Sequence, residues 1–207
     1  MSLNLVSKYF QPSSVLDIGC NTGQFYHSCK SVFPSARYYL VEGNYRCEPF
    51  IRTLGSDYSI ALLSDDIKTV DFYVRKNELL CTGNSIYREN TTFFTDDQII
   101  VEKLSTTTLD LLLPDSQFDL IKIDVQGSEV DIIRGGMNLV SKAKGLLLEV
   151  SLVEYNFNAP RKDDVMKFMK TIGYEPKELI GNIGHPIDGS LIQEDILFIN
   201  KSILDNN

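Results

Sequence analysis

The stretch Val15-Leu-Asp-Ile-Gly-Cys-Asn-Thr-Gly23 decides which fold this chain is expected to adopt. Its first four residues are apolar apart from one acid, as in a strand buried inside a parallel sheet. Two glycines separated by three small residues follow, and residues 24–33 then continue as an expected helix. A strand, a tight glycine turn and a helix N-terminus together form a nucleotide-sized pocket into which backbone N–H groups point.

The glycine spacing narrows the ligand expected in this pocket. An NAD- or FAD-binding turn, G-x-G-x-x-G, would need glycine at Asn21 and Gln24, and no Gly-Lys-Ser/Thr follows as in a P-loop. The remaining pattern, D-x-G-x-N-x-G, has a carboxylate at Asp17 that would repel a pyrophosphate and attract an ammonium group. This favours S-adenosylmethionine, which has a cationic amino-acid end and no phosphate, over a purely structural glycine turn.

Composition and charge restrict the class of protein. The 207 residues suffice for one domain over 1–207, and 43% hydrophobic and 23% charged residues are ordinary for a globular protein. No apolar run reaches the roughly 18 residues of a membrane span, and the N-terminus lacks a signal-peptide core. A net charge of −8 argues against a nucleic-acid partner. Without a C-x-x-C pair, the cysteines predict reduced thiols in the cytoplasm rather than a zinc site; they are Cys20, Cys29, Cys47 and Cys81.

Apolar strand-like segments alternate with helical ones along the chain, which is typical of a parallel α/β sheet. The expected strands are 15–19, 37–41, 58–63, 118–124, 144–150, 178–183 and 195–200. The expected helices are 24–33, 47–54, 106–113, 165–172 and one that begins at Ser128, whose hydroxyl can cap it, and ends at Gly135. After the third strand, residues 70–74, 85–88 and 99–104 have the pattern of short antiparallel strands where a helix would be usual.

Five motifs occur in an order that resembles the FkbM family of S-adenosylmethionine-dependent methyltransferases. They are Asp17–Gly23, Val41-Glu-Gly-Asn44, Thr108-Leu-Asp110, Ile121-Lys-Ile-Asp-Val-Gln-Gly-Ser-Glu129 and Glu194-Asp-Ile-Leu-Phe198. The resemblance implies an α/β class I methyltransferase (Rossmann-like) fold, with a seven-stranded, mostly parallel sheet and helices on both faces. It also implies an antiparallel last strand and a small antiparallel β insertion after the third strand. One departure is Gln126, where the family usually has glutamate.

The resemblance implies an activity as well. Members of the family are typically O-methyltransferases that act on sugar or polyketide hydroxyls, often in glycan assembly. We therefore expect O-methylation of a sugar or glycan acceptor, with a deoxyhexose such as rhamnose favoured. S-adenosylmethionine would be the donor and S-adenosylhomocysteine the product. The chain could also be one module of a larger glycan-synthesis protein.

In an open α/β sheet the ligand lies across the carboxyl ends of the strands, beside the first strand. Glu42 ends the second strand, and we expect it to accept hydrogen bonds from both ribose hydroxyls. The Gly19–Gly23 turn would surround the methionine part, and Ser64 with Asp65 would reach the adenine edge. The full set of expected donor contacts is Asp17, Gly19, Cys20, Asn21, Gly23, Glu42, Gly43, Asn44, Ser64, Asp65, Asp124 and Val125.

Methyl transfer to oxygen is an in-line displacement, so the protein mainly aligns the acceptor and takes up its proton. Asp124, at the end of the strand over 118–124 and beside the sulfonium, is the expected base. Lys122 should lie on the same side of that strand, either as a catalyst or as an ion partner of Asp124. His185, in the loop after the strand over 178–183, is a further candidate base, weighed against a structural role.

Three alternatives stay open. Asp124 and Glu149 end adjacent strands and could hold Mg²⁺ in a small-molecule O-methyltransferase. However, no Asp-Asn pair follows the strand over 144–150, so a metal-free mechanism is preferred. An RNA 2′-O-methyltransferase is disfavoured by the acidic charge. A degenerate methyltransferase fold that serves as a binding module is disfavoured because the acids and glycines of the motifs are intact.

Overall fold

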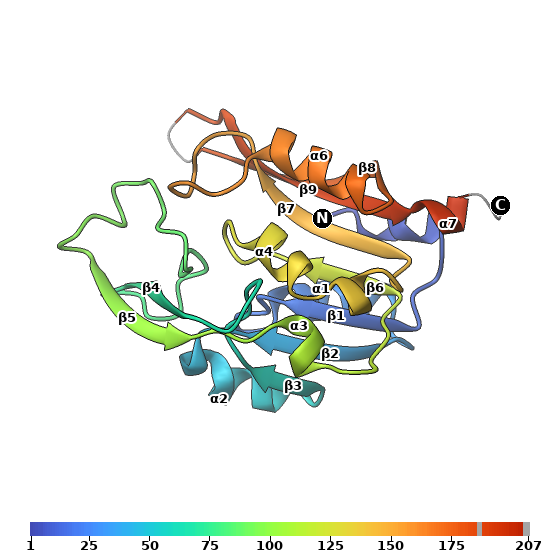
Figure 1. The fold of residues 1–207 in the computed structure, drawn as a ribbon, viewed down its shortest axis with the longest axis horizontal. Coiled ribbons are helices and arrows are strands. Elements are labelled where there is room, and N and C mark those ends of the chain that lie inside the picture. Colours follow the sequence, from blue (N-terminus) through green and yellow to red (C-terminus); the bar gives the residue numbers. More distant parts are fainter. Residues whose placement is uncertain (186–187, 205–207) are drawn as a thin grey trace.

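The computed structural model describes residues 1–185 and 188–204, and Figure 1 shows how they are arranged. The strands of the main sheet are β1 (Ser14–Ile18), β2 (Arg37–Glu42), β3 (Asp57–Ile60), β6 (Leu120–Ile123), β7 (Gly145–Ser151), β8 (Tyr174–Gly184) and β9 (Leu191–Asn200). Within the described residues, these seven strands run in the order β3-β2-β1-β6-β7-β9-β8. The pairs from β3 to β7 are parallel, whereas β9 is antiparallel to both of its neighbours. The expected sheet with an antiparallel last strand is therefore confirmed.

Helices cover both faces of this sheet, as expected (Figure 1). On one face lie η1 (Leu3–Lys8), α1 (Gln24–Val32), α2 (Glu48–Ile51) and α7 (Lys201–Leu204). On the other face lie α3 (Leu109–Leu112), α4 (Glu129–Arg134), α5 (Met137–Val140) and α6 (Lys162–Thr171). In the part of the chain that the structure describes, no helix has both the length and the apolar character needed to cross a membrane.

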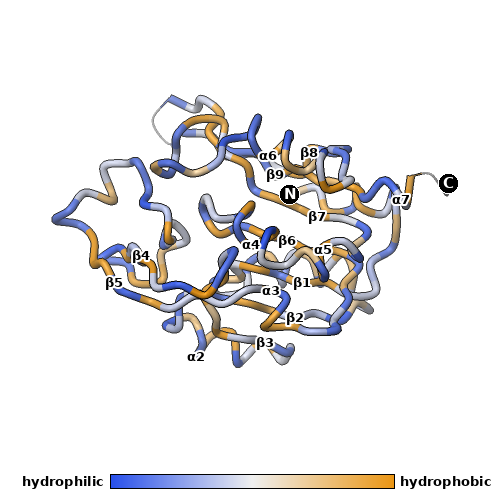
Figure 2. The backbone as a smooth tube through the Cα atoms, viewed as in Figure 1, coloured by the Kyte–Doolittle hydropathy of each residue, from blue (hydrophilic) through white to orange (hydrophobic). Residues whose placement is uncertain are grey.

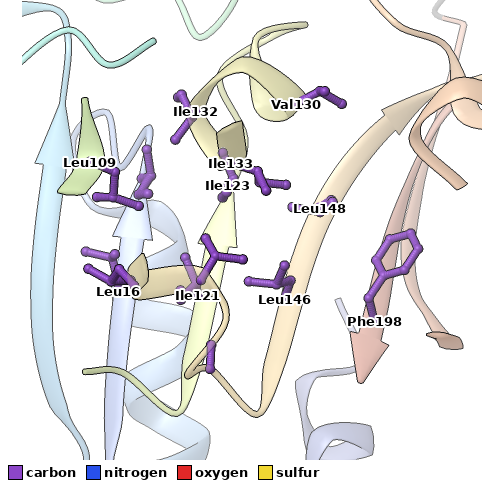
Figure 3. Close-up of a cluster of buried hydrophobic side chains, with 14 of the residues drawn as sticks. Leu16, Leu109, Ile121, Ile123, Val130, Ile132, Ile133, Leu146, Leu148 and Phe198 are labelled. Carbon is purple, nitrogen blue, oxygen red and sulfur yellow. The ribbon is translucent and has the colours of Figure 1, made fainter. Parts of the chain in front are cut away.

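The sheet is buried on both faces because its central strands are apolar at consecutive positions. In β1, Leu16 packs into one hydrophobic cluster and Val15 into the other. In β6, Ile121 and Leu120 are divided between the clusters in the same way. Figure 2 shows hydrophobic residues along these central strands, and Figure 3 shows the first cluster, where side chains of β1, β6 and β7 meet those of α4.

A second, two-stranded antiparallel sheet lies beside the main one and consists of β4 (Thr69–Arg75) and β5 (Ile99–Ser105). It confirms the expected insertion, and Figure 1 shows it at the left of the molecule. The expected strand over 85–88 is wrong, because Ser85 makes only an isolated bridge with Tyr73. The Ser85 hydroxyl instead donates to backbone carbonyls of the loop after β6, which draws this segment toward the main sheet.

Several expected boundaries also differ from the structure. The strand expected over 58–63 ends at Ile60, and the helix expected over 47–54 is broken into α2 and flanking 3-10 turns. The last two strands are longer than expected, since β8 and β9 pair over most of their length. Ser128 precedes α4 but makes no side-chain cap. Instead, the Glu129 carboxylate accepts hydrogen bonds from the backbone N–H groups of Val125 and Gly127.

Candidate active site

A cavity of about 370 Å³ opens at the carboxyl ends of β1, β2 and β6, where a parallel α/β sheet binds its ligands. The turns after these three strands form its floor, and the insertion contributes Phe72 and Ser85 to its wall. Ala61, Leu62 and Leu63 add an apolar side. The cavity therefore combines a polar end with an apolar end, as a nucleoside ligand requires.

The glycine turn after β1 forms the polar end of the cavity, as predicted. Gly19 has a φ of +77°, and a Cβ at this position would overlap the carbonyl oxygen of Asp124. Cys20 and Asn21 also line the cavity, whereas Gly23 lies outside its lining, packed against Leu54 where α1 begins. Gly19 is thus required by the close approach of two strand ends.

Glu42 joins the ends of β1 and β2. Its carboxylate accepts hydrogen bonds from the backbone N–H groups of Asn21, at 2.7 Å, and of Asn44, at 2.8 Å. Burial raises the pKa of Glu42 above its ordinary value, although these two hydrogen bonds oppose the shift. Glu42, Gly43 and Asn44 all line the cavity, as predicted. Each carboxylate oxygen has a second lone pair, so Glu42 can still accept from two neighbouring hydroxyl groups of a ligand.

Asp17 is placed differently from the prediction. It is 0% exposed and outside the cavity lining, and its oxygens accept no hydrogen bond within the described structure. Asp17 pairs in the β1–β6 register with Lys122, whose Nζ lies 3.6 Å from its Oδ1. Burial raises the pKa of Asp17 to about 6. Lys122, its partner, lines the cavity, whereas Asp17 does not. The expected direct contact of Asp17 with the donor's ammonium is therefore not supported by this geometry.

Lys122 is an ion partner of two carboxylates. Its Nζ lies 3.1 Å from Oδ2 of Asp124, closer than to Asp17. Burial alone would lower the pKa of Lys122, but the neighbouring carboxylates of Asp124 and Asp17 raise it. A lysine that keeps its proton so firmly cannot accept another from a substrate. Of the two roles open for Lys122, the structure favours the ion partner over the catalyst.

Asp124 is the second acid that lines the cavity, beside Glu42. It follows β6, lines the cavity together with Val125, and its side chain is 25% exposed. Its Oδ2 contacts Lys122, and its Oδ1 accepts a hydrogen bond from the side-chain amide of Gln126 at 3.0 Å. The carboxylate is therefore oriented at both oxygens while one side remains open to a ligand, which is the geometry expected of a base.

Ser64 and Asp65 do not line the cavity, so their predicted contact with adenine is not supported by this geometry. The Ser64 backbone N–H donates to the carbonyl of Thr107 at 3.0 Å, which turns the chain away from the cavity after Leu63. The Asp65 carboxylate then forms an ion pair with Lys68 at the surface. The apolar segment that precedes these residues lines the cavity in their place.

His185 lies beyond the end of β8 and outside the cavity lining. Its Nδ1 is 3.3 Å from Oδ1 of Asp188, and its side chain is 41% exposed. The structure therefore places His185 at the expected edge of the sheet without bringing it to Asp124. Its predicted role as a base is not supported by this geometry, because a base must be within hydrogen-bond reach of the reacting proton.

The alternative metal pair, Asp124 and Glu149, is separated by an amide group. The Gln126 Nε2 donates to Asp124 Oδ1 at 3.0 Å and to Glu149 Oε2 at 2.6 Å. Among residues 1–185 and 188–204, no group of three or more His, Cys, Asp or Glu side chains has the arrangement of a metal site. An amide N–H₂ between two carboxylates supplies donors where a cation needs ligands, so these residues do not fit Mg²⁺.

Sequence reasoning missed the polar residues behind Glu149. Gln193 donates to Glu149 Oε2 at 2.6 Å, and Asp195 lies opposite Glu149 in the β7–β9 register. Burial, with the charges of Asp124, Glu129 and Asp195, raises the pKa of Glu149 to about 10. A signal was present in the sequence, because Gln193 and Asp195 interrupt the otherwise apolar end of β9 on one side of the strand.

The comparisons with known proteins agree with this fold. The family model described as the methyltransferase FkbM domain matches residues 17–176, and the chain belongs to this family of methyltransferases. No curated protein sequence matches the chain.

Solved structures with the same fold are distant in sequence. The magnesium protoporphyrin IX methyltransferase of Synechocystis, solved with bound S-adenosylmethionine, is 14% identical, with a TM-score of 0.53, over 95% of this chain and 74% of that one. A putative RNA methyltransferase of Pyrococcus horikoshii is 10% identical, with a TM-score of 0.52, over 95% and 78%. A TehB-like methyltransferase of Corynebacterium glutamicum is 10% identical, with a TM-score of 0.51, over 96% and 86%. At these identities the likeness is one of fold.

The raised pKa of Glu149 predicts how stability depends on pH. The folded protein keeps a proton on Glu149 up to about pH 10, whereas the unfolded chain releases it near the ordinary value. Its contribution to the free energy of unfolding is therefore greatest at low pH and falls as the pH rises through this interval. As the pH rises, we expect the free energy of unfolding of Glu149→Gln to increase relative to that of the wild type by up to about 1.4 kcal/mol per pH unit. Urea unfolding between about pH 6 and pH 9 measures this difference; a difference that does not change with pH contradicts the prediction.

Proposed function

We propose that the protein transfers a methyl group from S-adenosylmethionine to a hydroxyl group of a sugar or glycan. S-adenosylmethionine is the cofactor: the chain belongs to a methyltransferase family, and methyltransferases of this fold have been solved with S-adenosylmethionine and S-adenosylhomocysteine bound. The observation that carries the proposed O-methylation is Asp124, a cavity carboxylate oriented at both oxygens and partly open. Such a group suits an acceptor that must lose a proton.

The residues around the cavity fit this donor from end to end. Glu42 offers free lone pairs for the two ribose hydroxyls. The turn over Gly19, Cys20 and Asn21, which lines the polar end of the cavity, suits the methionine part. The apolar segment Ala61–Leu63 and Phe72 suit the adenine ring. When bound, the donor supplies a methyl group already activated on a positively charged sulfur, so the protein has to align the acceptor and remove its proton.

Asp124 is the proposed proton acceptor. Lys122 and Gln126 each contact one of its oxygens, so the carboxylate cannot turn away without losing an interaction. Lys122 retains its own proton, because two carboxylates raise its pKa. His185 lies outside the cavity lining. Asp124 is thus the best-placed base among the three candidates predicted from the sequence.

Charge supports a sugar rather than RNA as the acceptor. The chain has 28 acidic and 20 basic residues, and RNA binding requires cations against the phosphates. Among the described residues that line the cavity, the only Lys or Arg side chain is Lys122, and it is already paired with two acids.

The four cysteines are unpaired in the described structure, which supports a reducing compartment such as the cytoplasm.

An acceptor screen with isotope-labelled donor tests the proposed function. We expect label to be transferred to hydroxyls of deoxyhexose or hexose glycosides and not to RNA. Full activity should remain in EDTA. Transfer to RNA with every glycoside inert would overturn the proposal, and loss of activity in EDTA with recovery in Mg²⁺ would favour the metal-dependent alternative.

Donor binding depends on Glu42 and not on Asp65. Glu42→Ala removes the expected acceptor of the ribose hydroxyls and should weaken S-adenosylhomocysteine binding by about 1.5–3 kcal/mol, the scale of charge-assisted hydrogen bonds. Asp65→Asn is the matched control, since Asp65 pairs with Lys68 outside the cavity. Its affinity should equal that of the wild type. Calorimetry measures both, and normal binding by Glu42→Ala would show that the ribose lies elsewhere.

Asp124→Asn keeps the size of the side chain but removes the base. We expect kcat for a glycoside to fall by about 10²–10⁴, the usual range for loss of a general base. His185→Ala should change kcat by less than about tenfold, because His185 does not line the cavity. Steady-state kinetics with both variants separates the two candidate bases. Full activity of Asp124→Asn would remove Asp124 from its proposed role.

A further inference from the structure

Gln126 has an unusual backbone conformation beside Asp124. Its φ of +59° lies in the left-handed region, which residues other than glycine rarely adopt. The surrounding structure fixes it there: the Ser85 hydroxyl donates to the carbonyls of Val125 and Gln126, at 2.8 and 3.0 Å. From the other side, the Glu129 carboxylate accepts from the N–H of Gly127 at 3.1 Å. A backbone outlier held by this many contacts is typical of a functional position.

This conformation directs the Gln126 side chain back toward two acids. Its Nε2 lies 3.0 Å from Asp124 Oδ1 and 2.6 Å from Glu149 Oε2. Both neighbours are acceptors, so the amide nitrogen rather than the amide oxygen has to face them. The amide oxygen faces the other way and accepts from Gln193 Nε2 at 3.4 Å. Gln126 therefore uses both of its N–H groups on carboxyl groups, and one of these is the proposed base.

Asp124 is consequently clamped between a cation and an amide. Lys122 Nζ holds Oδ2 at 3.1 Å, and Gln126 Nε2 holds Oδ1 at 3.0 Å. Rotation of the carboxylate about its bond to Cβ would break both interactions. Burial and nearby charges raise the pKa of Glu149 to about 10, so the second neighbour of the amide keeps its proton and does not compete as an anion.

We propose that Gln126 is a positioning residue that fixes the Asp124 carboxylate against the sulfonium of the bound donor. The inference rests on the proposed function for the place of the donor in the cavity. The inference concerns the negative charge of Asp124 beside the sulfonium, and it does not depend on which acceptor is methylated. A glutamate at this position could donate to Asp124 only in its protonated form, whereas the Gln126 amide donates in any case.

The difference between S-adenosylmethionine and S-adenosylhomocysteine isolates this charge. The two ligands differ by one methyl group and the positive charge on sulfur, so the ratio of their Kd values reports the negative charge that faces the sulfur. Calorimetry would measure this ratio for the wild type, Gln126→Met, Gln193→Met and Asp124→Asn. Gln193 is the control for the neighbouring hydrogen bonds, because it donates to Glu149 Oε2 and, at 3.4 Å, to Gln126 Oε1 but makes no hydrogen bond to Asp124.

We expect Asp124→Asn to lower the preference for S-adenosylmethionine most. Gln126→Met should lower it by about threefold to tenfold, since a carboxylate that turns away loses part of its attraction to the sulfonium. Gln193→Met should keep the wild-type ratio. Affinity for S-adenosylhomocysteine, whose sulfur is uncharged, should be similar in all four proteins, which also shows that each variant folds.

Other results would overturn the inference. A wild-type ratio in Gln126→Met, or equal losses in Gln126→Met and Gln193→Met, would show that the amide does not act through Asp124. An unchanged ratio in Asp124→Asn would show that Asp124 does not face the sulfonium. Failure to methylate any glycoside would contradict the proposed acceptor but would leave these binding ratios as they are, so the two failures are distinguishable.

Discussion

The site depends on the ion pairs that the buried ammonium group of Lys122 makes with two carboxylates. It lies opposite Asp17 in the register of β1 and β6 and reaches Asp124 at the end of its own strand. A carboxylate as deeply buried as Asp17 is unfavourable without a counter-charge, and the same cation also orients Asp124, which lines the cavity. One lysine thus connects the interior of the sheet to the wall of the site.

In this sheet, the residues that stabilise the fold differ from those that form the site. A buried ion pair contributes little net stability, because desolvation of the charges offsets their attraction. The apolar residues on both faces of the central strands stabilise the sheet instead, and Figure 3 shows one of these two layers. Like Asp17 and Lys122, the residues Glu149, Gln193 and Asp195 on β7 and β9 are polar and buried. They are buried at the functional end of the sheet, where parallel α/β folds place their ligands.

Much of the fold and part of the site could be predicted because their causes are local. Alternating strand and helix patterns predict the parallel sheet, and the Gly19 turn and the acid Glu42 follow directly from their positions at strand ends. The insertion was predicted from β-rich segments where a helix is usual. The strand expected over 85–88 was wrong, because the hydroxyl of Ser85 bonds to a loop about forty residues away, and a local pattern carries no record of such a contact.

By itself, the sequence determined the succession of strands along the chain, the glycine turn after the first of them and the acids at their ends. Only the tertiary structure decided which of those acids face the cavity. The register of β1 against β6 placed Lys122 in front of Asp17, and the left-handed turn at Gln126 aimed its amide at Asp124 and Glu149. The physical reason is that strand register and loop conformation depend on the packing of distant segments, whereas periodicity and turn chemistry are properties of neighbouring residues.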